Sequence, residues 1–412
     1  MEETRIALAH LGKIRPDSID DYIGIGGYAA LRKALQTEIE ILTQEIEKAG
    51  LRGRGGAGFS AGAKTRYSRM SCDLCPEKYV VCNADEGEPG TFKDRVIMEN
   101  DPHLLLEGIL IAAYIIGANK AYIYIRGEYI DSINRVKKAL FDAKANGIIG
   151  DSIFGSTFSC DVEIRLGAGS YLCGEELTLL ESLEGKRGYP RIKPPFPAEK
   201  GLFGKPTLIN NVETLAHYPS IIEHGADWYN SMGTEKSPGT KIFTISGKVN
   251  RPGFYEMQTG ITLRQMIYDV CGGMKEGSHF KAALLGGAAG TFVDESMLDI
   301  QLGYDTLKEQ NLTLGSGAII VLDQNDSVFK MLNNILRFFK HESCGKCVPC
   351  RVGCVQLLNI MGNIKESNNP DLVQSLIEEA EYMAQSSLCP LGQSPILPIK
   401  SAARFFSIAD QE

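Results

Sequence analysis

The 412-residue sequence contains no long hydrophobic segment of the kind that crosses a membrane. Its longest apolar stretch, from Gly108 to Ala118, is too short for a membrane span and is typical of a buried helix. The first ten residues, MEETRIALAH, carry two early acids and no apolar core, so no secretory signal is expected there. These features predict a cytoplasmic chain without direct membrane insertion.

Histidine is scarce, and the six histidines present do not support hydrolytic chemistry. They are scattered along the chain and form neither a ligand pair nor an HExxH motif, so zinc-dependent hydrolysis and histidine acid–base catalysis have no basis here. Positive charge is also in deficit, and the net charge of −8 argues against a nucleic-acid partner. A solvated loop explains the short basic string from Lys186 to Lys193 equally well.

Cysteine, in contrast, is abundant: the chain has eleven. Because no secretory signal is expected, clustered cysteines are better interpreted as metal or redox ligands than as disulfide partners. The spacing Cys344-x-x-Cys347-x-x-Cys350 can place three thiolates around one face of an iron–sulfur cube, which indicates a [4Fe–4S] cluster. Structural zinc usually takes two separated pairs instead.

The fourth cluster ligand is open from spacing alone. Cys354 completes the ferredoxin-like pattern C-x2-C-x2-C-x3-C, but Val355 stands where proline is expected. Cys389 follows the next helical stretch and could close the site from across a helical bundle. A second group of three thiols is a weaker metal candidate, since its third member falls in an expected strand: Cys72, Cys75 and Cys82.

Strands and helices alternate over roughly the first 230 residues. An apolar stripe predicts a helix from Leu31 to Ala49, which ends at Gly50. Strands are expected at Tyr79–Cys82, Ala121–Ile125 and Asp161–Leu166, and helices at Leu104–Ile116, Ser132–Ala145 and from Glu175. This alternation indicates an α/β fold with a parallel sheet covered on both faces.

The pattern changes after residue 237 and again near residue 328. Short strands and one helix indicate a small α+β domain: Lys241–Ser246, Ala283–Leu285, Ala318–Leu322 and Leu263–Cys271. From Val328 onward the apolar spacing is helical and predicts a C-terminal helical domain. The expected organisation is an N-terminal extension at 1–30, an α/β domain at 31–237, an α+β domain at 238–326 and a helical domain at 327–412.

A glycine-rich segment runs from Gly50 to Phe59 and contains G-x-G-x-x-G. A helix precedes it where the dinucleotide fingerprint requires a strand, so the usual Rossmann interpretation fails. Five glycines still let backbone amides approach a ligand closely, while Arg52, Arg54 and Lys64 supply positive charge for a phosphate. Taken alone, the segment could equally be a flexible surface loop.

Two further polar loops follow expected strands. Gly167–Glu176 follows a strand and opens a helix, and Asn83–Glu88 follows another strand. Glu175 and Glu176 could be first-turn acids favoured by the helix dipole, or could accept hydrogen bonds from a ribose. Because such loops meet at the carboxyl edge of a parallel sheet, one shared nucleotide site is expected.

Five segments, in this order, resemble those of one family: the NADH-binding flavoprotein subunit of respiratory complex I and of NAD-linked hydrogenases and formate dehydrogenases. They are GLRGRGGAGF, VCNADEGEPGTFKDR, GAGSYLCGEE, KPTLINNVETLA and ESCGKCVPCR. The resemblance covers nearly the whole chain. It implies a Rossmann-like FMN/NADH domain, a ubiquitin-like (β-grasp, SLBB-type) middle domain and a C-terminal helical bundle that carries the cluster.

The resemblance also implies the ligands of each cofactor. FMN and NAD(H) are expected to contact Gly53, Arg54, Gly55, Phe59, Lys64, Asn83, Asp85, Glu86, Glu88, Tyr171, Gly174, Glu175, Glu176, Phe196, Ile209, Asn210, Asn211 and Thr214. Within this set NADH stacks on the flavin beside Phe59, Glu88 and Glu176 orient it, and Phe196 covers its adenine. The cluster ligands implied are Cys344, Cys347, Cys350 and Cys389.

The implied activity is NADH oxidation, with hydride transfer to FMN and single electrons passed to the cluster; no protein acid or base is required. The segment from Ser387 to Gln393 is closer to the hydrogenase branch than to complex I. The expected partners are a thioredoxin-fold [2Fe–2S] subunit and a larger iron–sulfur or hydrogenase catalytic subunit. The alternatives are the complex I or formate dehydrogenase subunit, and a non-catalytic electron-relay or assembly subunit.

Overall fold

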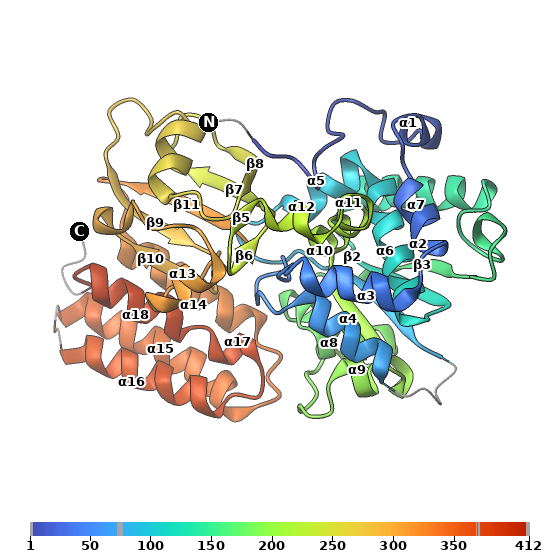
Figure 1. Ribbon diagram of the computed structural model, residues 1–412. Helices are drawn as coiled ribbons and strands as arrows, with labels where there is room; N and C mark the ends of the chain where they lie inside the picture. The colour runs from blue at the N-terminus through green and yellow to red at the C-terminus, as the bar shows by residue number, and fades with distance from the viewer. Residues whose placement is uncertain (1–2, 72–76, 368, 370, 409–412) are drawn as a thin grey trace.

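The computed structural model describes residues 3–71, 77–367, 369 and 371–408. In Figure 1 the chain forms a helix-rich α/β region on the right, a second sheet at the upper left and a helical bundle at the lower left. This arrangement confirms the expected fold class: a parallel sheet, then a mixed region, then a helical C-terminal region.

The first sheet has four parallel strands in the order β3-β2-β1-β4. Its strands are β1 (Tyr79–Ala84), β2 (Lys120–Arg126), β3 (Asp161–Gly167) and β4 (Thr207–Asn211). The first three were expected, but β4 was not: it has five residues and ends in two asparagines, which strands disfavour. The chain reverses its direction of travel across the sheet between β1 and β4, and this is the topological switch point.

Helices cover both faces of this sheet. They are α4 (Ala61–Met70), α5 (Lys93–Asn100), α6 (Pro102–Ile116), α7 (Ile130–Ala145), α8 (Glu176–Leu183), α9 (Pro197–Lys200), α10 (Val212–Ala216), α11 (Tyr218–His224) and α12 (Ala226–Asn230). All of α6 except Tyr114 is buried, as its apolar sequence predicts. Asp101 caps its first turn, and Gly117, at φ +77°, ends it.

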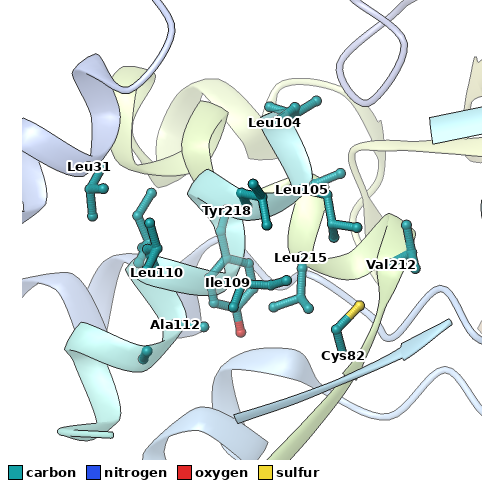
Figure 2. Packing of buried hydrophobic residues seen from close by; sticks show 14 of the residues in the cluster. Leu31, Cys82, Leu104, Leu105, Ile109, Leu110, Ala112, Val212, Leu215 and Tyr218 are labelled. Carbon is teal, nitrogen blue, oxygen red and sulfur yellow. The ribbon is translucent and has the colours of Figure 1, made fainter. Parts of the chain in front are cut away.

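The core of the α/β region lies where α6 crosses α10. Figure 2 shows Leu105 and Ile109 of α6 beside Leu215 and Val212, with Cys82 of β1 in the same cluster. The two helices approach so closely that a β-carbon at Gly108 would lie 2.0 Å from the carbonyl oxygen of Leu215. Glycine at this position therefore sets the distance between the two helices.

The N-terminal residues are packed rather than extended away from the body. Residues 31–49, expected as one helix, form α2 (Ala29–Leu35) and α3 (Ile39–Lys48), separated at Gln36–Glu38; α1 (Ile19–Gly24) precedes them. The carboxylate of Glu107 accepts hydrogen bonds from the backbone N–H groups of Tyr28 and Leu31, both at 2.9 Å. Ala7 and Leu8 donate to Glu256 in the second sheet, so this segment connects the two sheets.

The second sheet is mixed, with the order β10-β9-β11-β7-β8. Its strands are β7 (Thr240–Gly247), β8 (Gly253–Gln258), β9 (Phe280–Leu285), β10 (Thr291–Val293) and β11 (Ala318–Asp323). Strands β11 and β7 are parallel, and the other pairs are antiparallel. The helix expected at 263–271 is a π-helical turn at Gln265–Val270; α13 (Tyr304–Glu309) and a two-residue hairpin pair, β5 (Gly233–Thr234) and β6 (Ser237–Pro238), complete this part.

The C-terminal region is a helical bundle. It contains α14 (Val328–Glu342), α15 (Val348–Ser367), α16 (Asp371–Ser386), α17 (Pro390–Gln393) and α18 (Ile396–Phe405), of which the last two were not expected from the sequence. The predicted stripe of Leu332, Ile335, Leu336 and Phe339 is buried. Among the residues that the structure describes, no helix is long and apolar enough to cross a membrane.

Replacing Gly108 with alanine is expected to destabilise the α/β region. The new methyl group would overlap the Leu215 carbonyl, so α6 and α10 would have to separate at a cost of about 1–3 kcal/mol. Gly362→Ala, in the interior of α15 with open space around it, is the matched control and is expected to be neutral or stabilising. Urea unfolding followed by circular dichroism tests this; equal midpoints for both variants would contradict the packing argument.

Candidate functional site

Two polar loops diverge at the switch point of the parallel sheet. Asn83 at the end of β1 and Asn211 at the end of β4 are register partners. The Asn83 side chain donates to the carbonyl oxygen of Gly174 at 2.8 Å and accepts from the backbone N–H of Asp85 at 3.1 Å. Loops that follow β1, β3 and β4 are thereby brought to one edge, which is where open α/β sheets bind ligands.

The glycine-rich loop reaches the same edge from between α3 and α4. The backbone N–H of Arg54 donates to Thr214 Oγ1 at 2.9 Å, and a β-carbon at Gly55 would lie 3.1 Å from that of Asn211. Gly53 donates to the carbonyl oxygen of Phe59 at 2.7 Å, which closes the loop on itself. The loop is therefore anchored on β4 and α10 rather than free on the surface.

The arginines of this loop do not point outward as free cations. Arg54 is fully buried; its Nη2 donates to Tyr229 OH at 3.1 Å and to the carbonyl oxygen of Pro238 at 2.9 Å. Its Nε and Nη1 have no hydrogen-bond partner among the described residues. Arg52 pairs with Asp305 at 2.9 Å. Positive charge from Arg54 therefore acts on the loop from beneath it.

Lys64 takes part in a row of ion pairs at the sheet edge, together with Glu176 and Lys193. Its ammonium group lies 2.8 Å from Glu176 Oε2, and that of Lys193 lies 2.8 Å from Glu176 Oε1. Burial would raise the pKa of Glu176, but the two cations outweigh burial and lower the pKa to about 2. Glu175 caps α8 by accepting from the N–H groups of Leu177 and Thr178.

Asp85 carries a carboxylate oxygen that is prepared for a ligand. Its Oδ2 is buried and has no hydrogen-bond donor within the part of the chain described. Burial raises the pKa of this carboxyl to about 7, although Arg126 opposes the shift. Buried polar atoms are almost always paired, so the unpaired Oδ2 indicates a missing donor.

Two other acids of the Asn83–Glu88 loop are already engaged by the protein. The Glu86 carboxylate accepts from the N–H groups of Asp94 and Arg95 and caps α5. Glu88 accepts from Tyr171 OH at 2.6 Å and from the N–H of Ala289 at 3.0 Å. Burial raises the pKa of both carboxyl groups. The two residues thus connect the loop to α5 and to the second sheet.

A buried charge cluster behind the glycine loop was not identified from the sequence. Glu213 of α10 lies 3.0 Å from the ammonium of Lys93 and 3.2 Å from that of Lys241. Lys93 also pairs with Asp94 at 2.6 Å, and Lys241 donates to the carbonyl oxygen of Arg54. Burial would raise the pKa of Glu213, but Lys241 and Lys93 outweigh it and hold the pKa low. Sequence patterns assign charged residues to the surface, so no signal marked these.

The remaining residues of the expected set are of two kinds, two buried inside the protein and two exposed to solvent. Ile209 is buried in the core, and Asn210 donates to Tyr218 OH at 3.2 Å inside the protein. Phe59 and Phe196 are 56% and 51% exposed, which is unusual for phenylalanine and leaves both rings open to a ligand.

The cluster cysteines gather where α14, α15 and α17 meet. Cys344 and Cys347 lie between α14 and α15, and Cys350 is buried in the first turn of α15. A β-carbon at Gly392 would lie 2.9 Å from that of Cys350, so the turn after Cys389 packs directly on this ligand candidate. Burial raises the pKa of Cys389 to about 11, while the backbone N–H groups of Leu391 and Gly392 oppose the shift.

Cys354 lies one helical turn beyond Cys350 and is also buried. Across the described ranges, no three His, Cys, Asp or Glu side chains are close enough together to hold a single metal ion. Each cysteine of a cubane binds a different iron, so cluster ligands are spread more widely than the ligands of one ion. Cys72 and Cys75 lie outside the described residues; Cys82 is buried in β1, and burial raises its pKa.

The sheet edge and the segment after it contact residues that flank the cluster cysteines. Glu342, two residues before Cys344, accepts from the N–H of Tyr171 at 3.0 Å. Lys346, between two of the cysteines, donates to the carbonyl oxygen of Pro190 at 2.9 Å. The carboxylate of Glu175 also acts on the pKa of Cys389. A ligand at the sheet edge would therefore lie beside the cysteine cluster.

Comparisons with known proteins agree with this arrangement. Residues 46–220 match the Nuo51 FMN-binding domain, 241–322 the SLBB domain, and 330–409 the NADH-ubiquinone oxidoreductase-F iron-sulfur binding region. The chain is 42% identical over 410 residues to "NADP-reducing hydrogenase subunit HndC" of Solidesulfovibrio fructosivorans, covering 98% of this chain and 82% of that protein.

It is 44% identical over 396 residues to a subunit of an NADH-quinone oxidoreductase of Rhizobium meliloti (strain 1021), covering 94% of this chain and 92% of that protein. Among solved structures, an NAD⁺-reducing [NiFe]-hydrogenase in the air-oxidized state superimposes with a TM-score of 0.84 at 33% identity. That match covers 99% of this chain and 67% of the other.

His217, buried behind the glycine loop, makes the stability of this region sensitive to acid. Burial and the nearby Arg54 lower its pKa to about 3, so between pH 3 and 6.5 the unfolded state binds more protons than the folded state. Stability is therefore expected to fall as the pH drops below 6.5, by about 2 kcal/mol at pH 5 from this group alone.

His217→Gln keeps a hydrogen-bonding side chain near Tyr229 but cannot titrate. Urea unfolding at pH 7.5 and 5.0 should show a smaller loss of stability for the variant than for the original protein. An identical pH dependence in the two proteins would show that His217 does not carry the effect.

Proposed function

The chain belongs to the family of NADH-oxidising subunits that bind FMN and a [4Fe–4S] cluster, and from this premise we propose which residues hold each cofactor and what they do. The single observation that carries the proposal is that the loops of the sheet edge meet one another and that one of them contacts the helix that leads to the cluster cysteines. Tyr171 belongs to one of these loops; its backbone N–H and its ring both contact the helix that leads into Cys344.

The residues at the switch point fit FMN. The unpaired Oδ2 of Asp85 is suited to a hydroxyl donor such as the ribityl chain offers. The glycine loop around Gly55, anchored on Thr214 and with the buried Arg54 charge beneath it, suits its phosphate. When bound, FMN accepts a hydride from NADH and releases electrons one at a time.

The protein's own groups position NADH and keep the site's charges fixed. Phe59 and Phe196 offer exposed rings for stacking on the nicotinamide side and the adenine side. Glu176, held between Lys64 and Lys193, stays ionised and presents acceptor oxygens to hydroxyl groups. Glu88 accepts hydrogen bonds from Tyr171 and from Ala289, so it holds the Asn83–Glu88 loop against the second sheet. Its second role in the proposal is to face the nucleotide.

The test of the function is NADH-dependent reduction of ferricyanide by the purified, FMN-loaded chain. Gly55→Val is expected to release FMN and to lower dye reduction by about tenfold or more, because the added side chain would push the loop away from Asn211. Gly24→Val, where a side chain meets open space, is the control and should keep both flavin and activity. A flavin-loaded original protein that does not oxidise NADH would favour the non-catalytic relay subunit.

For the cluster we propose Cys389, rather than Cys354, as the fourth ligand beside Cys344, Cys347 and Cys350. The turn after Cys389 packs on Cys350. In this turn the backbone N–H groups of Leu391 and Gly392 are hydrogen-bonded to the sulfur of Cys389, and such donors stabilise a thiolate. Cys354 lies one turn further along the same helix as Cys350, and its thiol is hydrogen-bonded to that of Cys350, so it is the competing candidate.

Cys389→Ser is expected to lose the low-temperature electron paramagnetic resonance signal of the reduced cluster and most of the bound iron. The matched variant Cys354→Ser is expected to keep both. Iron and sulfide analysis of the reconstituted proteins provides a second readout. The opposite pattern, with the signal lost only in Cys354→Ser, would assign the fourth ligand to Cys354.

We propose further that the chain works in an NADH-linked hydrogenase, with a thioredoxin-fold [2Fe–2S] subunit and a larger iron–sulfur catalytic subunit as partners. The hydrogenase-like segment from Ser387 to Gln393 and the similarity to hydrogenase subunits support this branch. Similarity of nearly the same level to a quinone-reducing oxidoreductase keeps complex I as the alternative assembly. Co-purification with a hydrogenase-type or a quinone-reducing assembly distinguishes the two.

A further inference from the structure

Two serine hydroxyl groups lie beside Cys350, and the proposed function uses neither of them. Cys350 is only 5% exposed, so its sulfur depends on the protein rather than on bulk water for hydrogen-bond donors. The first hydroxyl is that of Ser343, whose Oγ lies 3.3 Å from the Cys350 sulfur, within hydrogen-bond distance of a sulfur atom. The second is that of Ser387, in the segment that leads to Cys389.

The direction of the Ser343 contact follows from the chemistry of a cluster ligand. A cysteine binds iron as a thiolate, which has no proton to give, so the Ser343 hydroxyl must be the donor. Its oxygen also accepts from the backbone N–H of Gly345 at 3.4 Å, and this contact leaves the hydroxyl proton free for the sulfur. Ser343 directly follows α14, whose last residue, Glu342, accepts from the N–H of Tyr171. The contact with the loop after β3 therefore helps to fix the hydroxyl in place.

Ser387 is 6% exposed, and its backbone groups are paired within the bundle. Its N–H donates to the carbonyl oxygen of Met383 at 2.9 Å, and its carbonyl oxygen accepts from Nε2 of Gln393 at 3.0 Å. Its Oγ, in contrast, has no hydrogen-bond partner among the described residues. Buried hydroxyl groups are almost always paired, so the Ser387 hydroxyl indicates an acceptor that the described chain does not supply.

Gly392 brings the unpaired hydroxyl and Cys350 together. A β-carbon at Gly392 would lie 2.4 Å from Ser387 Oγ and 2.9 Å from the β-carbon of Cys350, so the serine and the cysteine meet at one point. Cys389, two residues after Ser387, caps the short helix that contains Gly392. The unpaired hydroxyl therefore lies beside two of the proposed cluster ligands.

The thiol of Cys354 is a third group that is hydrogen-bonded to Cys350. A thiol is a weak hydrogen-bond donor, whereas a serine hydroxyl is a full donor. The two serines are therefore the stronger source of hydrogen bonds to sulfur at this position.

We propose that the hydroxyl groups of Ser343 and Ser387 donate hydrogen bonds to the sulfur atoms of the cluster at Cys350 and thereby raise its reduction potential. The inference rests on the proposed function, because it takes Cys350 as a cluster ligand. Reduction adds one electron to the cluster, and donors to its sulfur atoms stabilise the added negative charge. Both serines act through the sulfur atoms, so they are positioning residues that favour electron transfer from reduced flavin to the cluster.

The experiment is a redox titration of the full-length chain, loaded with FMN and cluster, followed by low-temperature electron paramagnetic resonance. It is read at the midpoint potential of the original protein. There the ratio of reduced to oxidised cluster is expected to fall about threefold in Ser343→Ala and in Ser387→Ala, and about tenfold in the double variant, which corresponds to about 59 mV for one electron. Ser343→Thr keeps a hydroxyl and is expected to restore the original ratio.

Ser386→Ala is the matched control, because it removes a hydroxyl one residue away that is exposed and donates to the carbonyl oxygen of Tyr382 at 2.6 Å. It should leave the ratio unchanged. Electron–nuclear double resonance of the reduced cluster provides a second readout. Exchange into D₂O should remove proton couplings from the original spectrum that Ser343→Ala and Ser387→Ala lack before exchange.

Unshifted midpoint potentials in the alanine variants, or an equal shift in Ser386→Ala, would overturn the proposal. Loss of bound iron from Ser387→Ala, with the proton couplings of Ser343→Ala unchanged, would show that the hydroxyls only support the fold and would also overturn it. An original chain that shows no [4Fe–4S] signal would contradict the proposed function and the inference together. Unshifted potentials of a loaded cluster would contradict the inference alone.

Discussion

The ion pairs around Glu213 hold the two sheets and the ligand edge in one arrangement. Glu213 lies in the first turn of the helix after β4 and accepts from Lys93 of α5, from Lys241 of β7 and from the N–H of Ile242. All three charged side chains are fully buried or nearly so, and removing one partner of such a set leaves an uncompensated buried charge, at about 3–5 kcal/mol. The ends of β4, α5 and β7 therefore have one stable relative position.

The same cluster explains why a glycine loop can serve here without a preceding strand. Arg54, Lys93 and Lys241 lie behind the loop, and Glu213, Asp94 and Glu86 are their buried carboxylate neighbours. Burial lowers the pKa of Lys241 to about 7, and the charges of Lys93 and Arg54 lower it as well. An anion at the loop would be attracted by the Arg54 guanidinium, two nitrogens of which have no partner among the described residues. Here buried side chains supply the positive potential that a helix N-terminus supplies in the dinucleotide fold.

The sequence could predict those elements and sites whose signal lies within a few neighbouring residues. Apolar runs predicted β1 to β3 and the buried helix α6, and the cysteine spacing indicated an iron–sulfur region, as the family match at 330–409 also does, because both signals lie within a few residues. Strand β4 was missed since its burial is set by β1 on its one paired side and by the helices α4, α9 and α10 that pack on it, rather than by its own composition. The roles of Arg54 and Glu86 could not be read locally either, because their partners lie far along the chain or depend on helix ends.

Helix α14 connects the nucleotide edge of the sheet to the cluster cysteines. The loop after β3 supplies Tyr171, which packs on Phe338 at a ring distance of 5.0 Å and binds Glu342. The helix that carries these two residues also lines a groove with α15, in which Arg337 and Lys340 lie. A single helix, α14, thus contacts the nucleotide edge with one face and solvent with the other, so the position of the cysteines that follow it is tied to that of the loop after β3.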